Sequence, residues 1–121
     1  MTATVEFQPN DAFYICCVGQ SVTFDSAWRT YCLVDRICFH DQCDDPTFAP
    51  HRLKMAHAVQ RAITAGLVTV ADNHISLCQD LSLRFDALRE SGLNEIAAAD
   101  EIDTFLQTQS WDAVSDGQLP P

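Results

Sequence analysis

Positive charge is scarce in this chain, which has seven Lys and Arg against seventeen Asp and Glu and a formal net charge of -10. A strong nucleic-acid binder neutralises about 6–10 phosphates, whereas the most basic stretch of the chain, residues 46–71, offers three Lys and Arg. A net charge this far from zero bears on solubility and on the choice of partner rather than on the fold. The shortage of cations therefore argues against nucleic acid as the default partner.

Long apolar runs are also missing. The longest is AFYICCV, residues 12–18, whereas a helix needs about 20 apolar residues to span a bilayer. The N-terminal MTATVEFQPNDAF has neither a basic start nor a long apolar stretch, so it does not match a secretory signal. We therefore expect a cytoplasmic protein that does not contact membranes.

Glycine occurs only four times, and no glycine belongs to a phosphate-cradling loop. The chain accordingly has neither a P-loop nor a dinucleotide-binding fingerprint. The patterns GxSxG and HExxH are absent as well. Kinase, nucleotide-hydrolysing, Rossmann-type and zinc-protease functions lose their main support, and we expect a protein that is not an enzyme.

Six cysteines are present, but no secretion signal accompanies them to support a disulfide framework. Cytosolic thiols normally stay reduced, and most of these cysteines lie in apolar runs where the side chain behaves as a small hydrophobe. A cysteine nucleophile is arithmetically possible because four histidines accompany them. It would need a thiolate beside a base, and the sequence does not indicate such an arrangement.

Zinc is the more specific chemical alternative. Cys38, His40 and Cys43 place three suitable ligands within six residues, and zinc favours mixed thiolate and imidazole sets. The fourth ligand could be Cys32, His51 or Cys78. Structural zinc sites usually pair two close ligands with two more at a matching spacing, and only one cluster exists here. We expect no cofactor and keep a zinc-stabilised domain as an alternative.

The first half of the chain predicts a mixture of strands and helix. Residues 13–18 and 21–24 are rich in β-branched and aromatic side chains and flank a glycine, which predicts a hairpin, with residues 5–7 as a third strand. Asp25 and Ser26 could cap a helix that begins at Ala27. Its apolar residues lie on all sides of the helical wheel, so two short strands are the alternative.

The second half has clearer periodicity. A helix is expected from Pro50 to the residue before Gly66, followed by a hairpin of residues 67–70 and 74–78. Asp80 could cap a helix through Leu88, and Asn94 could cap a last helix. The inward residues of that last helix would be Ile96, Ala99, Ile102, Phe105 and Leu106.

The order of these elements predicts an α+β fold. We expect one small domain over residues 1–111, in which two β-hairpins pack against about four helices and the C-terminal half is winged-helix-like. Residues 112–121 are expected to form a flexible C-terminal tail.

Residues 46–71 contain Arg52, Lys54 and Arg61 but no acid. In a helix, Lys54, His57, Arg61 and Thr64 share the side opposite the apolar residues. The stretch HRLKMAHAVQRAITAGLVTVADNHISLCQ, residues 51–79, resembles the recognition helix and wing of winged-helix proteins. The resemblance implies that these four side chains face DNA in the major groove, and that a wing tip at Asp72 and Asn73 touches the backbone.

The chain departs from that family at the wing tip, which carries an acid, and in its small number of cations. Residues 48–81 are also similar to the end of a small bacterial family of uncharacterised proteins, a likeness that implies a fold but no activity. The basic face could therefore be a solvated helix side, a surface for a protein, or a contact with DNA.

Residues 90–121 carry seven acids and no Lys or Arg. Four of these acids lie on the expected last helix: Glu95, Asp100, Glu101 and Asp103. We expect a non-enzymatic interaction protein, a regulator or inhibitor, that docks these acids on a basic partner surface such as that of a nucleic-acid-binding protein. A winged-helix DNA-binding transcriptional regulator is the alternative, and a homodimer is possible.

Overall fold

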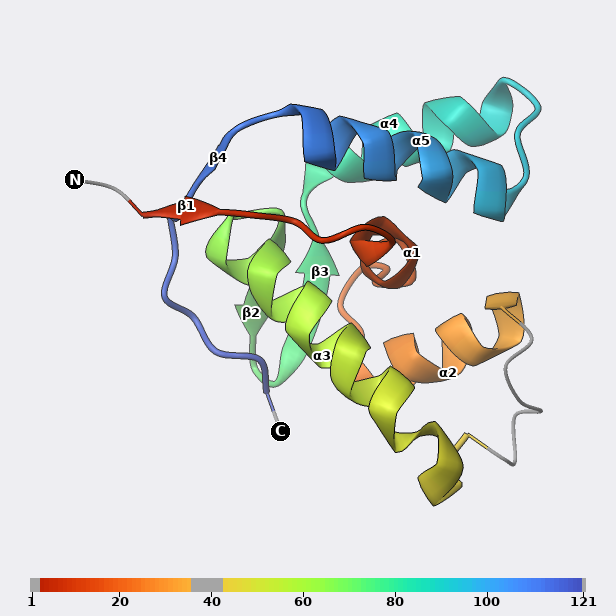
Figure 1. Ribbon diagram of the computed structural model, residues 1–121, viewed down its shortest axis with the longest axis vertical. Coiled ribbons are helices and arrows are strands. Elements are labelled where there is room, and N and C mark those ends of the chain that lie inside the picture. The colour runs from red at the N-terminus through yellow and green to blue at the C-terminus, as the bar shows by residue number, and fades with distance from the viewer. Residues whose placement is uncertain (1–2, 36–42, 121) are drawn as a thin grey trace.

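Five α-helices and two small antiparallel sheets make up residues 3–35 and 43–120, the part of the chain that this computed structural model describes (Figure 1). The helices are α1 (Asp11–Ile15), α2 (Phe24–Asp35), α3 (Ala49–Thr64), α4 (Gln79–Glu90) and α5 (Glu95–Thr108). The strands are β1 (Thr4–Val5), β2 (Val68–Ala71), β3 (His74–Leu77) and β4 (Trp111–Asp112). This architecture confirms the expected small α+β domain. Within the described residues, no helix is both long and apolar enough to cross a membrane.

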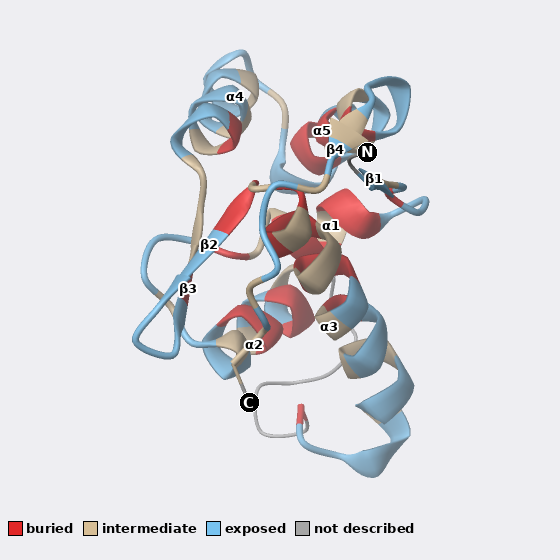
Figure 2. Ribbon diagram, turned by 90° about the vertical axis from the view of Figure 1, so that its left-hand side faces the viewer, coloured by how far each residue is buried: buried red, intermediate tan, exposed pale blue. Residues whose placement is uncertain are grey.

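The core centres on α1, which packs against both α3 and α5. Ile15 of α1, Val59 of α3 and Ile102 of α5 are completely buried. Full burial of such a side chain stabilises the fold by about 1.5–3 kcal/mol. Figure 2 shows the buried residues concentrated on the inner helices, whereas α4 presents mostly exposed residues at one end of the molecule.

The prediction of an N-terminal hairpin is wrong. Residues 11–15 form α1, and Val22 forms only an isolated bridge with Ile75 of β3. A short apolar run cannot be distinguished from a buried helix by periodicity alone. Here the run is buried on more than one side, which suits a central helix better than a half-exposed strand.

The expected start of α2 and the expected third strand are also corrected. Helix α2 begins at Phe24, and the backbone N–H of Ser26 donates to Oγ1 of Thr23, so Thr23 supplies the first-turn contact that we assigned to Asp25 or Ser26. Residues 4–5 do form a strand, but it pairs with β4 at the other end of the chain. The helix that we expected here, rather than two short strands, is confirmed through Asp35, and residues 36–39 lie outside the described residues.

The order of α3 and the second hairpin agrees with the sequence prediction. Pro50 lies in the first turn of α3, and Gly66 ends it with a φ of 80°. Strands β2 and β3 pair antiparallel from Val68 with Leu77 to Ala71 with His74. Asp72 and Asn73 link them with positive φ values, as a two-residue type I′ turn requires.

The last two helices follow the prediction in part. Asn94 caps α5, because its Oδ1 accepts the N–H of Ala97 at 2.8 Å. Asp80 does not cap α4, whose N-cap is Cys78 without a side-chain bond. Of the residues expected to point inward from α5, Ala99, Ile102 and Leu106 are buried, but Ile96 is 49% exposed.

The segment after α5 contacts the domain although we expected a flexible tail there. Strand β4 pairs with β1, and the two lie side by side in Figure 1. The backbone N–H groups of Val114 and Ser115 donate to the carbonyl of Thr64, and Leu119 N–H donates to Oε1 of Gln60. A Cβ on Gly66 would lie 2.6 Å from Cγ2 of Val114. Gly66 therefore both ends the helix and leaves room for the side chain of Val114.

Candidate functional site

The outer face of α3 is the first candidate surface. Lys54 and His57 are exposed there, and neither forms an ion pair with another described residue. Together with Arg61 they line a surface pocket of about 360 Å³, whose other wall is the segment from Gln8 to Asp11 and Tyr14. The structure thus brings together three of the four residues that we assigned to DNA.

Arg61 does not point to solvent as the winged-helix resemblance implied. Its Nε and Nη2 atoms each lie 2.7 Å from an oxygen of Asp11, whose side chain is only 4% exposed. This bidentate geometry is the strong form of a charge-assisted hydrogen bond. Asp11 Oδ2 also accepts the N–H of Gln8. Arg61 therefore joins α3 to α1, and its charge is neutralised by a buried carboxylate.

Sequence reasoning missed Asp11 as a partner for Arg61. The signal was nevertheless present, because Asp11 directly precedes the longest apolar run of the chain. A buried carboxylate almost always has a partner. The partner could not be identified from the sequence, because Arg61 lies 50 residues further along the chain.

Thr64 is also only partly available for a ligand. Its hydroxyl donates to the carbonyl of Gln60, and its own carbonyl accepts two N–H groups from the segment after β4. Gln60 contacts that same segment through Gly117 and Leu119. Residues 112–119 thus cover the last turn of α3, and the exposed part of the candidate DNA face is its first half.

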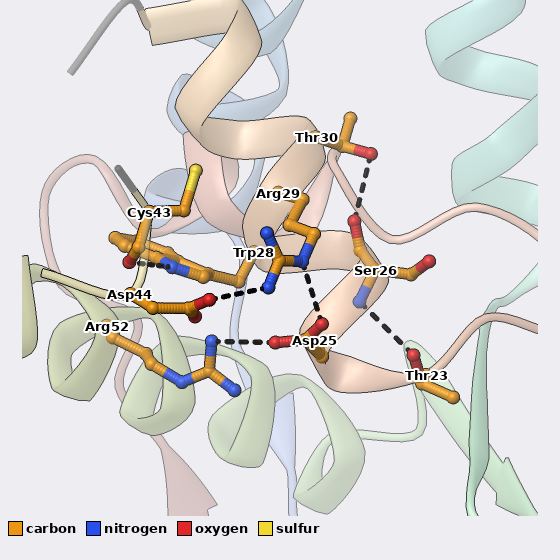
Figure 3. A network of polar contacts seen from close by, with 9 residues as sticks. All are labelled: Thr23, Asp25, Ser26, Trp28, Arg29, Thr30, Cys43, Asp44 and Arg52. Atoms are coloured by element: carbon orange, nitrogen blue, oxygen red, sulfur yellow. Dashed lines mark hydrogen bonds and ion pairs between the residues drawn. The ribbon is translucent and has the colours of Figure 1, made fainter. Parts of the chain in front are cut away.

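The third cation of the basic stretch, Arg52, belongs to a network of charged side chains (Figure 3). Its Nη1 lies 3.2 Å from Asp25 Oδ1, while Arg29 contacts Asp25 at 2.9 Å and Asp44 at 2.8 Å. The hydrogen bond from Arg29 is the largest of the causes that lower the pKa of Asp25. Exposed pairs of this kind contribute little stability, but they leave less positive charge for a phosphate.

Acids on α5 form the second candidate surface. Asp100 and Glu101 are exposed and form no ion pair with the described residues. Glu95 lies 3.9 Å from Arg89, at the outer limit of an ion pair. Asp103 differs, because it is half-buried and accepts hydrogen bonds from Ala12 N–H and from the Gln107 amide. Three of the four expected acids therefore face solvent, and Asp103 turns toward α1.

The zinc alternative cannot be assembled from what the structure shows. Cys38 and His40 lie outside the described residues, so only Cys43 of the expected cluster is placed. Cys43 is buried, and its carbonyl accepts the indole N–H of Trp28 at 3.1 Å. Within residues 3–35 and 43–120, no three His, Cys, Asp or Glu side chains lie close enough to hold a metal.

Cys16 is the thiol whose environment is most distinctive. Burial raises its pKa to about 12, and the neighbouring Cys17 and Asp103 act in the same direction. A nucleophilic cysteine needs the opposite shift, because the thiolate is the reactive form. Cys16 is therefore a neutral, apolar group at physiological pH.

We expect the raised pKa of Cys16 to make the protein less stable at alkaline pH. The ordinary value is about 9 and the folded value about 12, so this contribution is fully present below pH 9 and is lost as pH rises toward 12. The slope is at most about 1.4 kcal/mol per pH unit for one proton. Denaturant unfolding at several pH values should show a shallower alkaline loss for Cys16→Ser than for the unaltered protein, and parallel curves would contradict this.

No family model, curated protein or solved structure matches the chain. The resemblances to winged-helix proteins and to a bacterial family therefore stay predictions. The functional argument accordingly depends on the geometry and charge of the two surfaces described above.

Proposed function

We propose that this protein is a non-enzymatic interaction protein, and that it binds a basic surface of a protein partner through α5. The observation that carries the proposal is the contrast between its two charged surfaces. On α3, Arg61 is bound by a buried carboxylate. On α5, Glu95, Asp100 and Glu101 remain exposed. The described chain thus keeps these three acids exposed on α5, whereas Arg29, Arg52 and Arg61 are paired with its own carboxylates.

The acids of α5 are held in place before any partner arrives. Ala98, Ala99, Ile102 and Leu106 anchor the helix in the core, and Asn94 caps its first turn. A binding surface on a rigid helix has little backbone to order on association, which lowers the entropic cost of binding. Complementary charge would then speed the encounter and disfavour acidic partners. A nucleic-acid-binding protein is a suitable partner class, because the carboxylates can occupy the positions of phosphates.

We expect reversal of the exposed acids to weaken partner capture by about tenfold or more. The test compares the immobilised protein with a Glu95→Lys, Asp100→Lys, Glu101→Lys variant in native lysate. Removing three charge pairs of about 0.2–1 kcal/mol each and adding like-charge repulsion gives a loss of this order. The quantity measured is the salt concentration at which each captured partner elutes.

A matched control separates this surface from net charge alone. Glu6, Asp112 and Asp116 are exposed acids outside α5, and their replacement by lysine changes the total charge by the same amount. Capture should survive in this control variant. Equal loss in both variants, or no loss in either, would contradict a specific role for α5.

A winged-helix DNA-binding regulator is the second candidate, and one observation favours it. The described chain runs α1, the Val22 bridge, α2, α3 and then the β2–β3 hairpin, with Val22 paired to Ile75 of β3. A helix pair followed by a hairpin is what the winged-helix resemblance implies. Lys54 and His57 would then be the side chains with access to DNA.

Nuclease treatment of the lysate distinguishes the two candidates within the same experiment. A protein partner of α5 should still be captured after the nucleic acid has been removed. Capture that disappears with nuclease, together with a DNA shift at low salt that Lys54→Ala weakens, would favour the DNA-binding candidate instead.

A further inference from the structure

A pocket lies between α1, α2, α4 and α5. It shares Glu95 with the acidic surface of α5 and no residue with the basic surface of α3. Its volume is about 140 Å³. Side chains from α1, α2, α4 and α5 line it, together with Cys16 and Cys17 directly after α1. Most of these side chains are apolar, and the neutral Cys16 thiol adds to that character.

The size of the pocket matches a single aromatic ring. An apolar cavity of about 150 Å³ in a protein core is large enough to take up benzene. Phe13, Tyr31 and Phe85 provide aromatic surface for such a ring, and aromatic pairs gain energy beyond simple burial. A long alkyl chain or a nucleotide would not fit in this volume.

The negative charge at the pocket favours ring-bearing molecules that carry a positive charge. Glu95 is the one carboxylate among the described lining residues, and no Lys or Arg is found among them. Asp103 lies close enough to Cys16 to raise its pKa, so a second negative charge is near. Arg89 approaches Glu95 only at 3.9 Å, and both side chains are about half exposed. Such a pair is weak, and a ligand cation can replace it.

We propose that this pocket binds a small arylalkylamine, with the ring between the helices and the ammonium group at Glu95. The inference does not depend on the proposed partner of α5, because it is measured on the purified chain alone. Failure of partner capture therefore leaves it intact, and its own failure leaves the partner proposal intact.

The test uses three molecules of the same shape and different charge. Benzylamine, benzyl alcohol and benzoate are titrated against the full chain by ligand-observed NMR. Benzylamine should bind about three- to fivefold more tightly than the alcohol, the advantage of one exposed charge pair, and benzoate should bind most weakly. Glu95→Gln should remove the difference between amine and alcohol. Equal binding of all three molecules, or no effect of Glu95→Gln, would overturn the assignment of an amine.

Two exposed positions allow the pocket to be closed without disturbing the core. Ile96 lines the pocket and is 49% exposed, and Leu33 on α2 is 57% exposed but does not line it. Ile96→Trp should abolish benzylamine binding, whereas the matched Leu33→Trp should leave it unchanged. If both variants bind alike, the amine occupies a different place and the proposal is wrong.

Protection of a cysteine from alkylation provides an independent test of ligand binding in the pocket. Benzylamine should slow the reaction of iodoacetamide with Cys17, which lines the pocket beside the neutral Cys16 thiol, as measured by mass spectrometry. Cys78, at the N-cap of α4, does not line the pocket and serves as the internal reference. Equal protection of Cys17 and Cys78 would contradict occupancy of this pocket.

Discussion

Replacing Arg61 by alanine is expected to lower the free energy of unfolding by about 3–5 kcal/mol. The change leaves the Asp11 carboxylate without its bidentate partner while its side chain is only 4% exposed. An uncompensated buried charge is among the most destabilising of single substitutions. Since small domains are stable by about 5–15 kcal/mol in total, the variant should unfold at much lower denaturant concentration.

Two further variants make this result specific to the ion pair. Asp11→Ala should cost less, because Arg61 is 29% exposed and can be hydrated when it loses its partner. The double variant should therefore be more stable than Arg61→Ala alone. Lys54→Ala is the matched cation control on the same helix, and a change within about 0.5 kcal/mol is expected for such a surface position.

The same series separates a structural role for Arg61 from a role at DNA. An exposed side chain whose contacts are with DNA can be removed with little effect on the stability of the free protein, as we expect for Lys54. If Arg61→Ala unfolded at the same urea concentration as Lys54→Ala, the ion pair with Asp11 would contribute nothing, and the case against Arg61 as a DNA contact would fail.

Trp28→Ala should have an effect of similar size, about 3–5 kcal/mol. Trp28 is completely buried, and its ring stacks on Tyr31 at a centroid distance of 5.7 Å. Alanine would leave a large cavity and would also leave the Cys43 carbonyl without the indole N–H that it accepts at 3.1 Å. Far-UV circular dichroism during urea unfolding measures the loss without relying on tryptophan fluorescence.

A graded substitution divides that effect into packing and hydrogen bonding. Trp28→Phe keeps much of the ring but removes the donor, so it should cost about 0.5–1.5 kcal/mol, the usual contribution of one hydrogen bond. Leu33→Ala on the same helix starts from a side chain that is 57% exposed and should be close to neutral. A Trp28→Ala variant as stable as Leu33→Ala would show that Trp28 does not hold α2 to the segment containing Cys43.

Local signals predicted the second half of the fold well. The proline in the first turn of α3, the glycine at its end and the Asn94 cap all act within a few residues along the chain. The α3–β2–β3 order could therefore be predicted from spacing and turn residues alone. Helical periodicity placed Glu95, Asp100 and Glu101 outside correctly, but not Asp103, which is half-buried against α1.

Long-range contacts account for what sequence reasoning missed. The apolar run after Asp11 has strand-forming residues, but its place between α3 and α5 makes it a helix. The chain's last described strand also has a long-range contact, because Trp111 packs edge-on against Phe7 as well as against Phe105. Propensity alone cannot predict such contacts, because tertiary packing overrides it.

The sequence by itself therefore determined the acidic character of this protein, its α+β class and the residues available on α3 and α5. Only the tertiary structure decided which of those charges remain outside. Arg61 is matched to a carboxylate 50 residues away, and residues far apart in the chain line the pocket beside Glu95. The physical reason is that a charge is neutralised by its nearest neighbours in space, which the order of residues along the chain does not specify.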